Sequence, residues 1–398
     1  MRLVLVGMTF FFVVATSTWA APPTHPGIFE LYSGHLNPDE EVWRLTHSDA
    51  LLPNTKVARG AHARPLPRAP SPLTNLHFTS GGESYDLHDY LALDRVAGLL
   101  VLKDGRVAYE DYELGTGPDT HWFSASVAKS ITSTLVAAAV QDGSISSLDD
   151  PIGRYLPVMN QGAYAQVTIR QALQMASGVQ WDEAYAQETS DRRQLLKLQL
   201  AQKPGSMLQF MSERTRATAA GGLWHYNTGD AFVVGAVVEA ATHQSLAQYL
   251  SEKIWKPWGM EADANWWAES ANGTGFGGGG LSATLRDYAR FGLFVMNDGV
   301  IDGRRVVPAG WFDEAGSRTK IGDSWVDYGY YWWIPPQDQP AHAGAFEAIG
   351  IFGQYLYVNR REHVVIAVLS AQPKAEGMEP VASDDFFAAV VEKLQAHQ

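Results

Sequence analysis

The pattern of apolar and polar positions divides the chain into two strand-rich parts that flank a helix-rich middle. Alternating apolar residues on both sides of an Asp104-Gly105 turn predict a β-hairpin. Aromatic and β-branched runs near the other end predict a further strand and a second hairpin. The predicted strands cover residues 99–103, 106–112, 328–334, 354–358 and 364–370.

Apolar residues at helical spacing predict several amphipathic or buried helices. These cover residues 131–140, 168–175, 230–242, 246–255, 284–296 and 383–394. The order predicts one α/β (α+β) body, an antiparallel sheet flanked by helices and interrupted by a mostly helical lobe at about 144–280. Five glycines within 275–280 predict a flexible joint at the end of that lobe. The cleft between the two lobes is where we expect chemistry.

The first 76 residues have the patterns of a secretory signal and of a proline-rich arm. Arg2, an apolar run and small residues before Ala21 predict a secretory signal over residues 1–20. The apolar run is short for a membrane span, so we expect export, to a bacterial periplasm, and no stable membrane anchor. Residues 21–76 are rich in proline and predict an extended arm. The remaining residues, 77–398, form the predicted globular domain.

Composition narrows the classes of partner and cofactor. The chain of 398 residues is 46% hydrophobic and 18% charged, which is ordinary for a globular protein with an ample core. A formal net charge of −13 and the lack of a long basic stretch argue against nucleic acid as a partner. The absence of cysteine excludes disulfides, thiol catalysis and thiolate metal sites. Since no paired-histidine spacing occurs either, we expect neither a metal nor a cofactor.

The most informative pair is Ser126 and Lys129, three positions apart at the start of the apolar helix. Positions i and i+3 share a helix face, and a lysine whose pKa is lowered by burial can take the proton of a serine. The same spacing recurs at Ser317 and Lys320, where no apolar helix follows. We interpret that second copy as a solvated loop, and the first needs further partners to indicate catalysis.

Two other segments offer such partners. Tyr226 precedes the helix at 230–242, which Thr228 or Asp230 could cap, and its phenol could relay a proton. Glycines at a strand start, as in 350–354, let a substrate approach the backbone, and an N–H there could help to hold an oxyanion. Each segment also fits a purely structural role.

Together, Ser126-x-x-Lys129, Tyr226-x-Thr228 and the segment 350–354 (Gly-Ile-Phe-Gly-Gln) resemble motifs of the serine β-lactamase-like superfamily. The resemblance covers about residues 77–395. The similar branch contains class C β-lactamases, β-lactamase-fold carboxylesterases and 6-aminohexanoate-dimer hydrolases. It implies a β-lactamase/transpeptidase-like fold, with Ser126 as nucleophile, Lys129 as base and Tyr226 as proton relay.

The same resemblance implies further site residues. The backbone N–H groups of Ser126 and Ile351 would form the oxyanion hole. Three residues would contact the substrate: Tyr185, Thr228 and Gly350. Trp332 and Trp333 either line the cleft or belong to the core.

One family motif, a Lys/His-Thr/Ser-Gly triplet, is absent. This favours hydrolysis of a small-molecule ester, amide or peptide over recognition of a β-lactam carboxylate. A penicillin-recognising β-lactamase or D-amino peptidase-like protein with slow turnover is the alternative, and an interaction-only fold is a third. A Ser-His-Asp arrangement with His225 or His342 lacks a Gly-x-Ser-x-Gly elbow.

Overall fold

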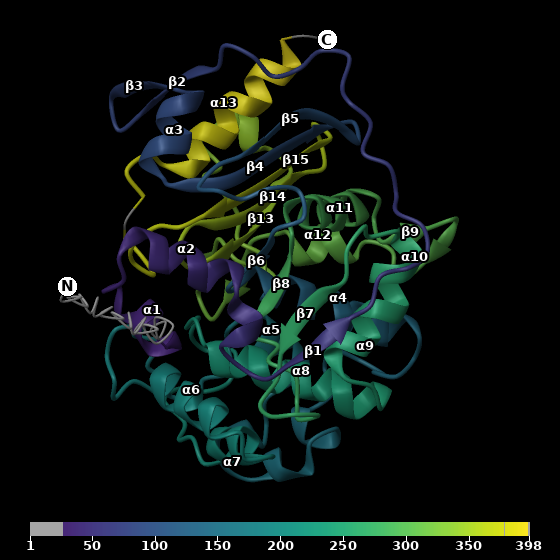
Figure 1. Cartoon of the computed structure of the whole chain (residues 1–398). Helices are drawn as coiled ribbons and strands as arrows, with labels where there is room; N and C mark the ends of the chain where they lie inside the picture. The colour runs from purple at the N-terminus through teal and green to yellow at the C-terminus, as the bar shows by residue number, and fades with distance from the viewer. Residues whose placement is uncertain (1–26, 378, 397–398) are drawn as a thin grey trace, which may run out of the picture.

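The computed structural model describes residues 27–377 and 379–396. The signal predicted over residues 1–20 lies outside the described residues. Figure 1 shows a lobe of strands covered by helices at the top and a mostly helical lobe below it. This is the mixed α/β architecture with antiparallel sheets that the sequence predicts.

The main sheet has five antiparallel strands in the order β13-β14-β15-β4-β5. Its strands are β4 (Val96–Lys103), β5 (Arg106–Tyr112), β13 (Ala345–Gly350), β14 (Gln354–Asn359) and β15 (Val364–Ser370). Both predicted hairpins are confirmed, as β4–β5 and β14–β15. Pairing of β15 with β4 joins the two ends of the domain into one sheet.

Helices cover both faces of this sheet, α3 (Leu87–Leu93) and α13 (Ser383–Gln395) above it and α11 (Leu285–Met296) below it in Figure 1. Successive apolar side chains of β4 point to opposite faces of the sheet, so each face packs against a layer of helices. Leu99 and Val101 belong to the cluster that contains the apolar residues of α13, and Leu100 and Leu102 belong to the larger core below.

A second, four-stranded sheet was not predicted. Its order is β1-β7-β8-β6, and its strands are β1 (Asn54–Val57), β6 (His121–Phe123), β7 (Ala264–Trp267) and β8 (Leu281–Thr284). The strands have three or four residues each, too few for a periodic pattern to stand out.

The predicted extended arm is only in part extended. It contains β1, which is extended, but also α1 (Ile28–Ser33) and α2 (Pro38–Thr46), and the expectation of an extended chain is wrong at these two helices. The reason is local: Asn37 caps α2 ahead of a proline at its first position, and apolar residues such as Leu31 and Leu45 join the core.

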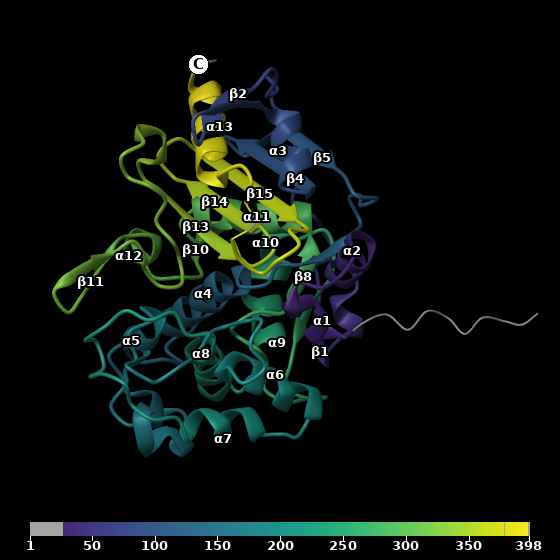
Figure 2. The ribbon, with the colours of Figure 1, turned by 90° about the vertical axis from the view of Figure 1, so that its left-hand side faces the viewer.

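The lower lobe is mostly helical, as predicted. Its main helices are α4 (Val127–Gln141), α5 (Ile169–Leu173), α6 (Asp191–Ala201), α7 (Ser206–Ser212), α8 (Thr228–Thr242) and α9 (Leu246–Leu250). Helix α4 contacts both α8 of this lobe and β13 of the main sheet, and Figure 2 shows it at the junction of the lobes. The start of α4 therefore lies where the two lobes meet.

The remaining elements are short. They are η1 (Ser48–Ala50), β2 (His77–Ser80), β3 (Glu83–Asp86), η2 (Ile152–Arg154), η3 (Pro157–Asn160), η4 (Gly162–Tyr164), the π-helical η5 (Ser251–Trp255), α10 (Lys256–Trp258), β9 (Val300–Ile301), β10 (Arg304–Arg305), α12 (Trp311–Ala315), β11 (Thr319–Ile321), β12 (Ser324–Val326) and η6 (Pro340–His342).

The aromatic run predicted as a strand over 328–334 is not one. It forms a bend with only isolated bridges, and Tyr331 has a positive φ of 61°. The bend separates the two tryptophans: Trp332 is fully buried against Phe346, whereas Trp333 lines the cavity described below.

Candidate active site

Ser126 is the residue that precedes α4, and Ser124 and Ala125 separate it from the short strand β6. The chain turns sharply between β6 and α4, and Ala125 is held at a positive φ of 47°, a strained conformation for a residue with a side chain. A hydrogen bond of 2.9 Å from Ser124 N to Leu281 O fixes this turn to β8. The Ser126 hydroxyl makes no capping bond to the helix, so its side chain is free for another partner.

That partner is Lys129. Its Nζ lies 2.7 Å from Ser126 Oγ and 2.7 Å from the carbonyl oxygen of Gly278. The lysine is 1% exposed, and burial lowers its pKa to about 7, opposed by the Glu183 carboxylate and assisted by the Arg192 cation. Near neutral pH a large fraction of this amine is therefore unprotonated and able to accept a proton.

The Gly278 carbonyl comes from the glycine-rich segment 275–280. A Cβ on Gly278 would lie 2.8 Å from the Thr228 carbonyl oxygen, and one on Gly277 would lie 2.5 Å from the Ala231 carbonyl oxygen. The segment is buried against α8, so the expectation of a flexible joint is wrong. Glycine is required there because the backbones approach closely, and this approach brings an acceptor to Lys129.

Tyr226 lies beside the pair. The centre of its ring is 5.0 Å from Lys129 Nζ, and its phenol interacts with the Ser126 hydroxyl. Burial, followed by the Glu183 carboxylate, raises the pKa of this phenol above its usual range. Tyr226 thus stays protonated at neutral pH and can donate a hydrogen bond to a group that reacts at Ser126.

The turn between β13 and β14 packs onto the segment before Ser126. A Cβ on Gly350 would lie 2.5 Å from the Ser124 carbonyl oxygen, so only glycine permits this contact. The next residue, Ile351, lines the same cavity as Ser126. Within the described residues, the backbone N–H groups of Ser126 and Ile351 have no acceptor. Two unpaired donors beside a serine hydroxyl are what an oxyanion hole requires.

Glu183 is the site residue that sequence reasoning missed. Its carboxylate accepts hydrogen bonds from Tyr185 OH (2.9 Å), Thr228 N (2.9 Å) and Thr228 Oγ1 (2.5 Å), and another from the Trp181 indole. The sequence predicts that Tyr185 and Thr228 contact substrate. Both hydroxyls donate to Glu183, and Tyr185 also lines the cavity that contains Ser126. The only signal of Glu183 in the sequence is its place two residues before Tyr185.

The helix that follows Tyr226 is capped by neither predicted residue. Asn227 accepts the capping bond from Asp230 N at 3.0 Å. Thr228 Oγ1 is engaged with Glu183, and Asp230 Oδ1 accepts from Tyr164 OH at 2.6 Å inside the core.

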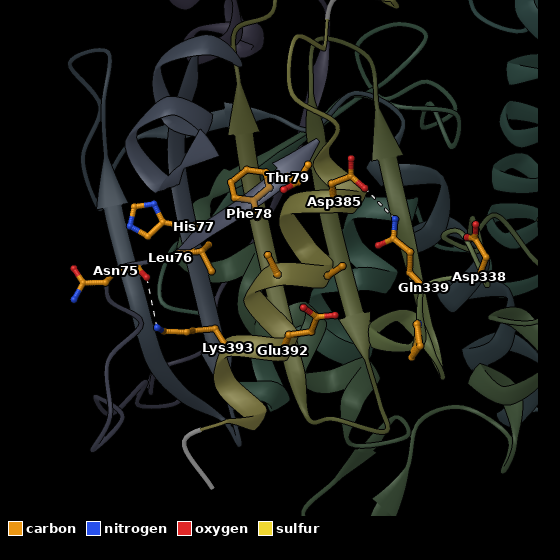
Figure 3. Close-up of a pocket in the computed structure, with 13 residues that line it drawn as sticks. Asn75, Leu76, His77, Phe78, Thr79, Asp338, Gln339, Asp385, Glu392 and Lys393 are labelled. Atoms are coloured by element: carbon orange, nitrogen blue, oxygen red, sulfur yellow. Dashed lines mark hydrogen bonds between the residues drawn. The ribbon is translucent and has the colours of Figure 1, made fainter. Parts of the chain in front are cut away.

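These groups meet at a cavity of about 480 Å³. Its lining includes Ser126, Glu183, Tyr185, Trp224, His225, Tyr226, Trp333, Ile349, Gly350, Ile351, Gly353, Tyr355, Gln372, Ala375, Glu376, Gly377 and Glu379. A larger groove of about 720 Å³ lies between β2 and α13, as Figure 3 shows, and none of the predicted site residues lines it.

The second Ser-x-x-Lys copy and the two candidate histidines do not form an alternative catalytic site within the described residues. Ser317 and Lys320 are both exposed, and the Ser317 hydroxyl donates to Asp313 O at 2.5 Å. Figure 2 shows the β11–β12 hairpin, which holds Lys320, projecting from the body. Buried His342 contacts Tyr357 OH at 3.1 Å, and His225 contacts the Trp181 carbonyl oxygen at 2.8 Å. Within the described residues, neither ring forms a hydrogen bond with the Ser126 hydroxyl.

The described residues contain no group of histidines and carboxylates able to hold a metal ion. Among the same residues, no helix is both long and apolar enough to span a bilayer.

The comparison with known proteins decides the family. The model of the beta-lactamase family matches residues 94–388. The chain belongs to this family. By that membership it is a serine hydrolase of the β-lactamase fold, as its sequence motifs indicate.

Similar proteins include one named as a 6-aminohexanoate-dimer hydrolase and a structure of a carboxylesterase. The chain is 28% identical to a 6-aminohexanoate-dimer hydrolase of Paenarthrobacter ureafaciens, over 83% of this chain and 85% of that protein. A Bacillus anthracis structure proposed to be such a hydrolase is 23% identical, with a TM-score of 0.76 over 89% of this chain and 94% of that one. A family VIII carboxylesterase shares the fold at 14% identity and a TM-score of 0.58, over 76% and 93%.

Proposed function

We propose that the protein is an exported hydrolase that cleaves ester or amide bonds through an acyl-enzyme on Ser126. The observation that carries this proposal is the 2.7 Å contact between Ser126 Oγ and the buried Lys129 amine, whose pKa is about 7. A lysine in that state can act as a general base near neutral pH. Export follows from the predicted signal over residues 1–20.

In the first half-reaction, Lys129 Nζ takes the proton of the Ser126 hydroxyl as Oγ attacks the carbonyl carbon of the substrate. The N–H groups of Ser126 and Ile351 hold the negative charge that develops on the carbonyl oxygen. Tyr226 donates its phenol proton to the leaving alkoxide or amine and regains one from Lys129. The products are the acylated serine and a released alcohol or amine.

In the second half-reaction, water attacks the acyl-serine and transfers a proton along the same groups in reverse. Ser126 then leaves as a hydroxyl, and a carboxylic acid is released. Glu183 holds Tyr185 and Thr228 beside this path, which supports a positioning role for the carboxylate rather than direct contact with the reacting atoms.

The similar proteins support an ester or an amide as substrate, because one is named for hydrolysis of a 6-aminohexanoate dimer and another is a carboxylesterase. A penicillin-recognising protein with slow turnover remains the second candidate, since the fold is shared with β-lactamases. The two candidates differ in the lifetime of the acyl-enzyme.

Trapping the acyl-enzyme tests the proposal. Brief incubation with p-nitrophenyl acetate, followed by acid quenching and peptide mass spectrometry, should show an acetyl group on Ser126. The adduct should disappear within seconds to minutes at neutral pH, and a labelled benzylpenicillin should not accumulate on the protein. An adduct on another residue would refute the assignment, and a stable penicillin adduct without ester turnover would favour the second candidate.

The dependence of ester turnover on pH provides a further prediction. Because the unprotonated form of Lys129 is the base, kcat/KM for a neutral ester should rise with pH through about 7. The Glu183 carboxylate raises the pKa of Lys129, so Glu183→Gln should move this rise to lower pH. Glutamine can keep the local bonds, since its amide oxygen can face Trp181 and its NH₂ group can face the two hydroxyls.

Glu83→Gln on β3, an exposed carboxylate remote from the cavity, is the matched control and should leave the profile unchanged. A profile of Glu183→Gln that coincides with that of the wild type would contradict the electrostatic coupling between Glu183 and Lys129.

A further inference from the structure

Charge is unevenly distributed around the cavity that contains Ser126. Three carboxylates line it, those of Glu183, Glu376 and Glu379, and its described lining includes neither lysine nor arginine. Lys129 lies behind Ser126 and is buried. The buried Arg192 cation lies close enough to Glu183 for their charges to interact, so it offsets one of the three carboxylates. Glu376 and Glu379 still give the lining an excess of negative charge, in a chain whose formal net charge is already −13.

Two of these carboxylates are available to a ligand. Glu376 forms no hydrogen bond or ion pair with the described residues, and it is close enough to Glu183 for their charges to repel. Glu379 uses Oε1 to accept from Tyr355 OH at 2.9 Å and from Ser383, which holds the carboxylate in place. Glu183 differs from both because protein donors already occupy its oxygens.

A second and independent feature is an aromatic wall formed by Trp224, Tyr226 and Trp333, all of which line the same cavity. The ring of Trp333 lies 5.8 Å from that of Trp224 and 5.7 Å from that of Tyr226. Aromatic faces attract cations through their quadrupole, and they do so best when water is partly excluded. A cation between this wall and the carboxylates would be stabilised by both.

We propose that the cavity binds a cationic substrate, an ester or amide whose acyl or leaving group carries an ammonium group, held between Glu376, Glu379 and the aromatic wall. This inference rests on the proposed function, because the cation site and Ser126 share one cavity. The same charges oppose substrates with a carboxylate near the scissile carbonyl.

Two matched ester series test this. The acyl series consists of p-nitrophenyl esters of 6-(trimethylammonio)hexanoate, its neutral isostere 7,7-dimethyloctanoate, and the anionic heptanedioate monoester. The leaving-group series compares acetylthiocholine with 3,3-dimethylbutyl thioacetate. In at least one series, kcat/KM for the cation should exceed that for the neutral isostere by about tenfold, and added salt should reduce the ratio.

Glu376→Gln should lower the ratio of cation to neutral ester several-fold. Asp323→Asn, at the exposed turn of the β11–β12 hairpin, removes one negative charge far from the cavity and should leave the ratio unchanged. Binding of phenyltrimethylammonium to the Ser126→Ala protein, measured by calorimetry, should weaken in the added presence of Glu376→Gln, and this measurement needs no turnover.

The outcomes separate the two proposals. Equal kcat/KM for all charges in both series, with no binding of phenyltrimethylammonium, overturns the cation site even if hydrolysis depends on Ser126. Binding of the cation that depends on Glu376, in a protein that cleaves none of the esters, supports the cation site and refutes the proposed function.

Discussion

Replacement of Ser126 by alanine should reduce kcat for p-nitrophenyl esters on the order of 10⁴-fold or more, the scale seen when a nucleophile is removed. The residual rate comes from the oxyanion donors and from binding. Ser126 is suited to this test because its hydroxyl caps no helix and its main partner, Lys129, keeps a bond to the Gly278 carbonyl oxygen. We therefore expect the melting temperature of the variant to stay within a few degrees of wild type.

Ser317→Ala is the matched control, because Ser317 belongs to the second Ser-x-x-Lys of the chain and is exposed. It should retain full turnover. Wild-type turnover in Ser126→Ala, measured on protein with unchanged far-UV circular dichroism, would refute the role of Ser126. Loss of turnover in both variants would point to an effect on folding rather than on chemistry.

The local pattern was sufficient to predict the elements that hold this serine. Helix α4 runs over fifteen residues and ends in a continuous apolar run at residues 135–140 ahead of Gly143, so both its existence and its end near Asp142 could be predicted. The contact of Ser126 with Lys129 follows from i, i+3 spacing on that helix, which needs no information about tertiary structure. Hairpins β4–β5 and β14–β15 were likewise predictable, because each strand repeats its pattern over at least six residues.

The features that the sequence did not predict correctly depend on contacts between segments that are distant along the chain. Glu183 lies in a loop without periodicity, and its importance arises only because Thr228, 45 positions later, is brought against it. Strand β7 has four residues, and its partner β1 comes from about 200 positions earlier in the chain. The glycines at 275–280 could be recognised as unusual, but the sequence alone did not distinguish flexibility from close packing against α8.

The N-terminal cap of α8 is another feature that tertiary contacts decide. Asn227, Thr228 and Asp230 are all residue types that cap helices, and local preference does not separate them. The choice is made by tertiary contacts, because Glu183 engages Thr228 and Tyr164 engages Asp230. This leaves Asn227 to cap the helix, and it directs the Thr228 hydroxyl toward the active-site carboxylate.

Lys129→Met should combine a large loss of activity with a gain in stability. Removal of a general base costs about 10²- to 10⁴-fold in kcat. The gain arises because the pKa of Lys129 falls from its ordinary value of 10.5 to about 7 in the folded protein. Below pH 7, folding must bury an ammonium group, at a cost on the order of 5 kcal/mol relative to the unfolded chain.

The free-energy cost of burying the Lys129 ammonium group depends on pH, because the pKa of Lys129 is lower in the folded chain than in the unfolded chain. Between pH 7 and 10.5 the unfolded chain binds more protons than the folded chain, so the penalty shrinks as pH rises. Methionine removes the penalty but leaves the Gly278 carbonyl oxygen without its donor, a loss of about 1–3 kcal/mol. At pH 6 the free energy of unfolding should therefore exceed that of wild type by about 2–4 kcal/mol, and the difference should shrink at pH 9.5.

Urea unfolding of both proteins at the two pH values, together with ester turnover, measures this trade-off directly. Lys320→Met, at the exposed lysine of the second Ser-x-x-Lys, is the control and should change neither quantity. A Lys129→Met protein that is less stable than wild type at pH 6 would contradict the lowered pKa. One that retains turnover would contradict the assignment of Lys129 as the base, because no other amine within the described residues contacts the Ser126 hydroxyl.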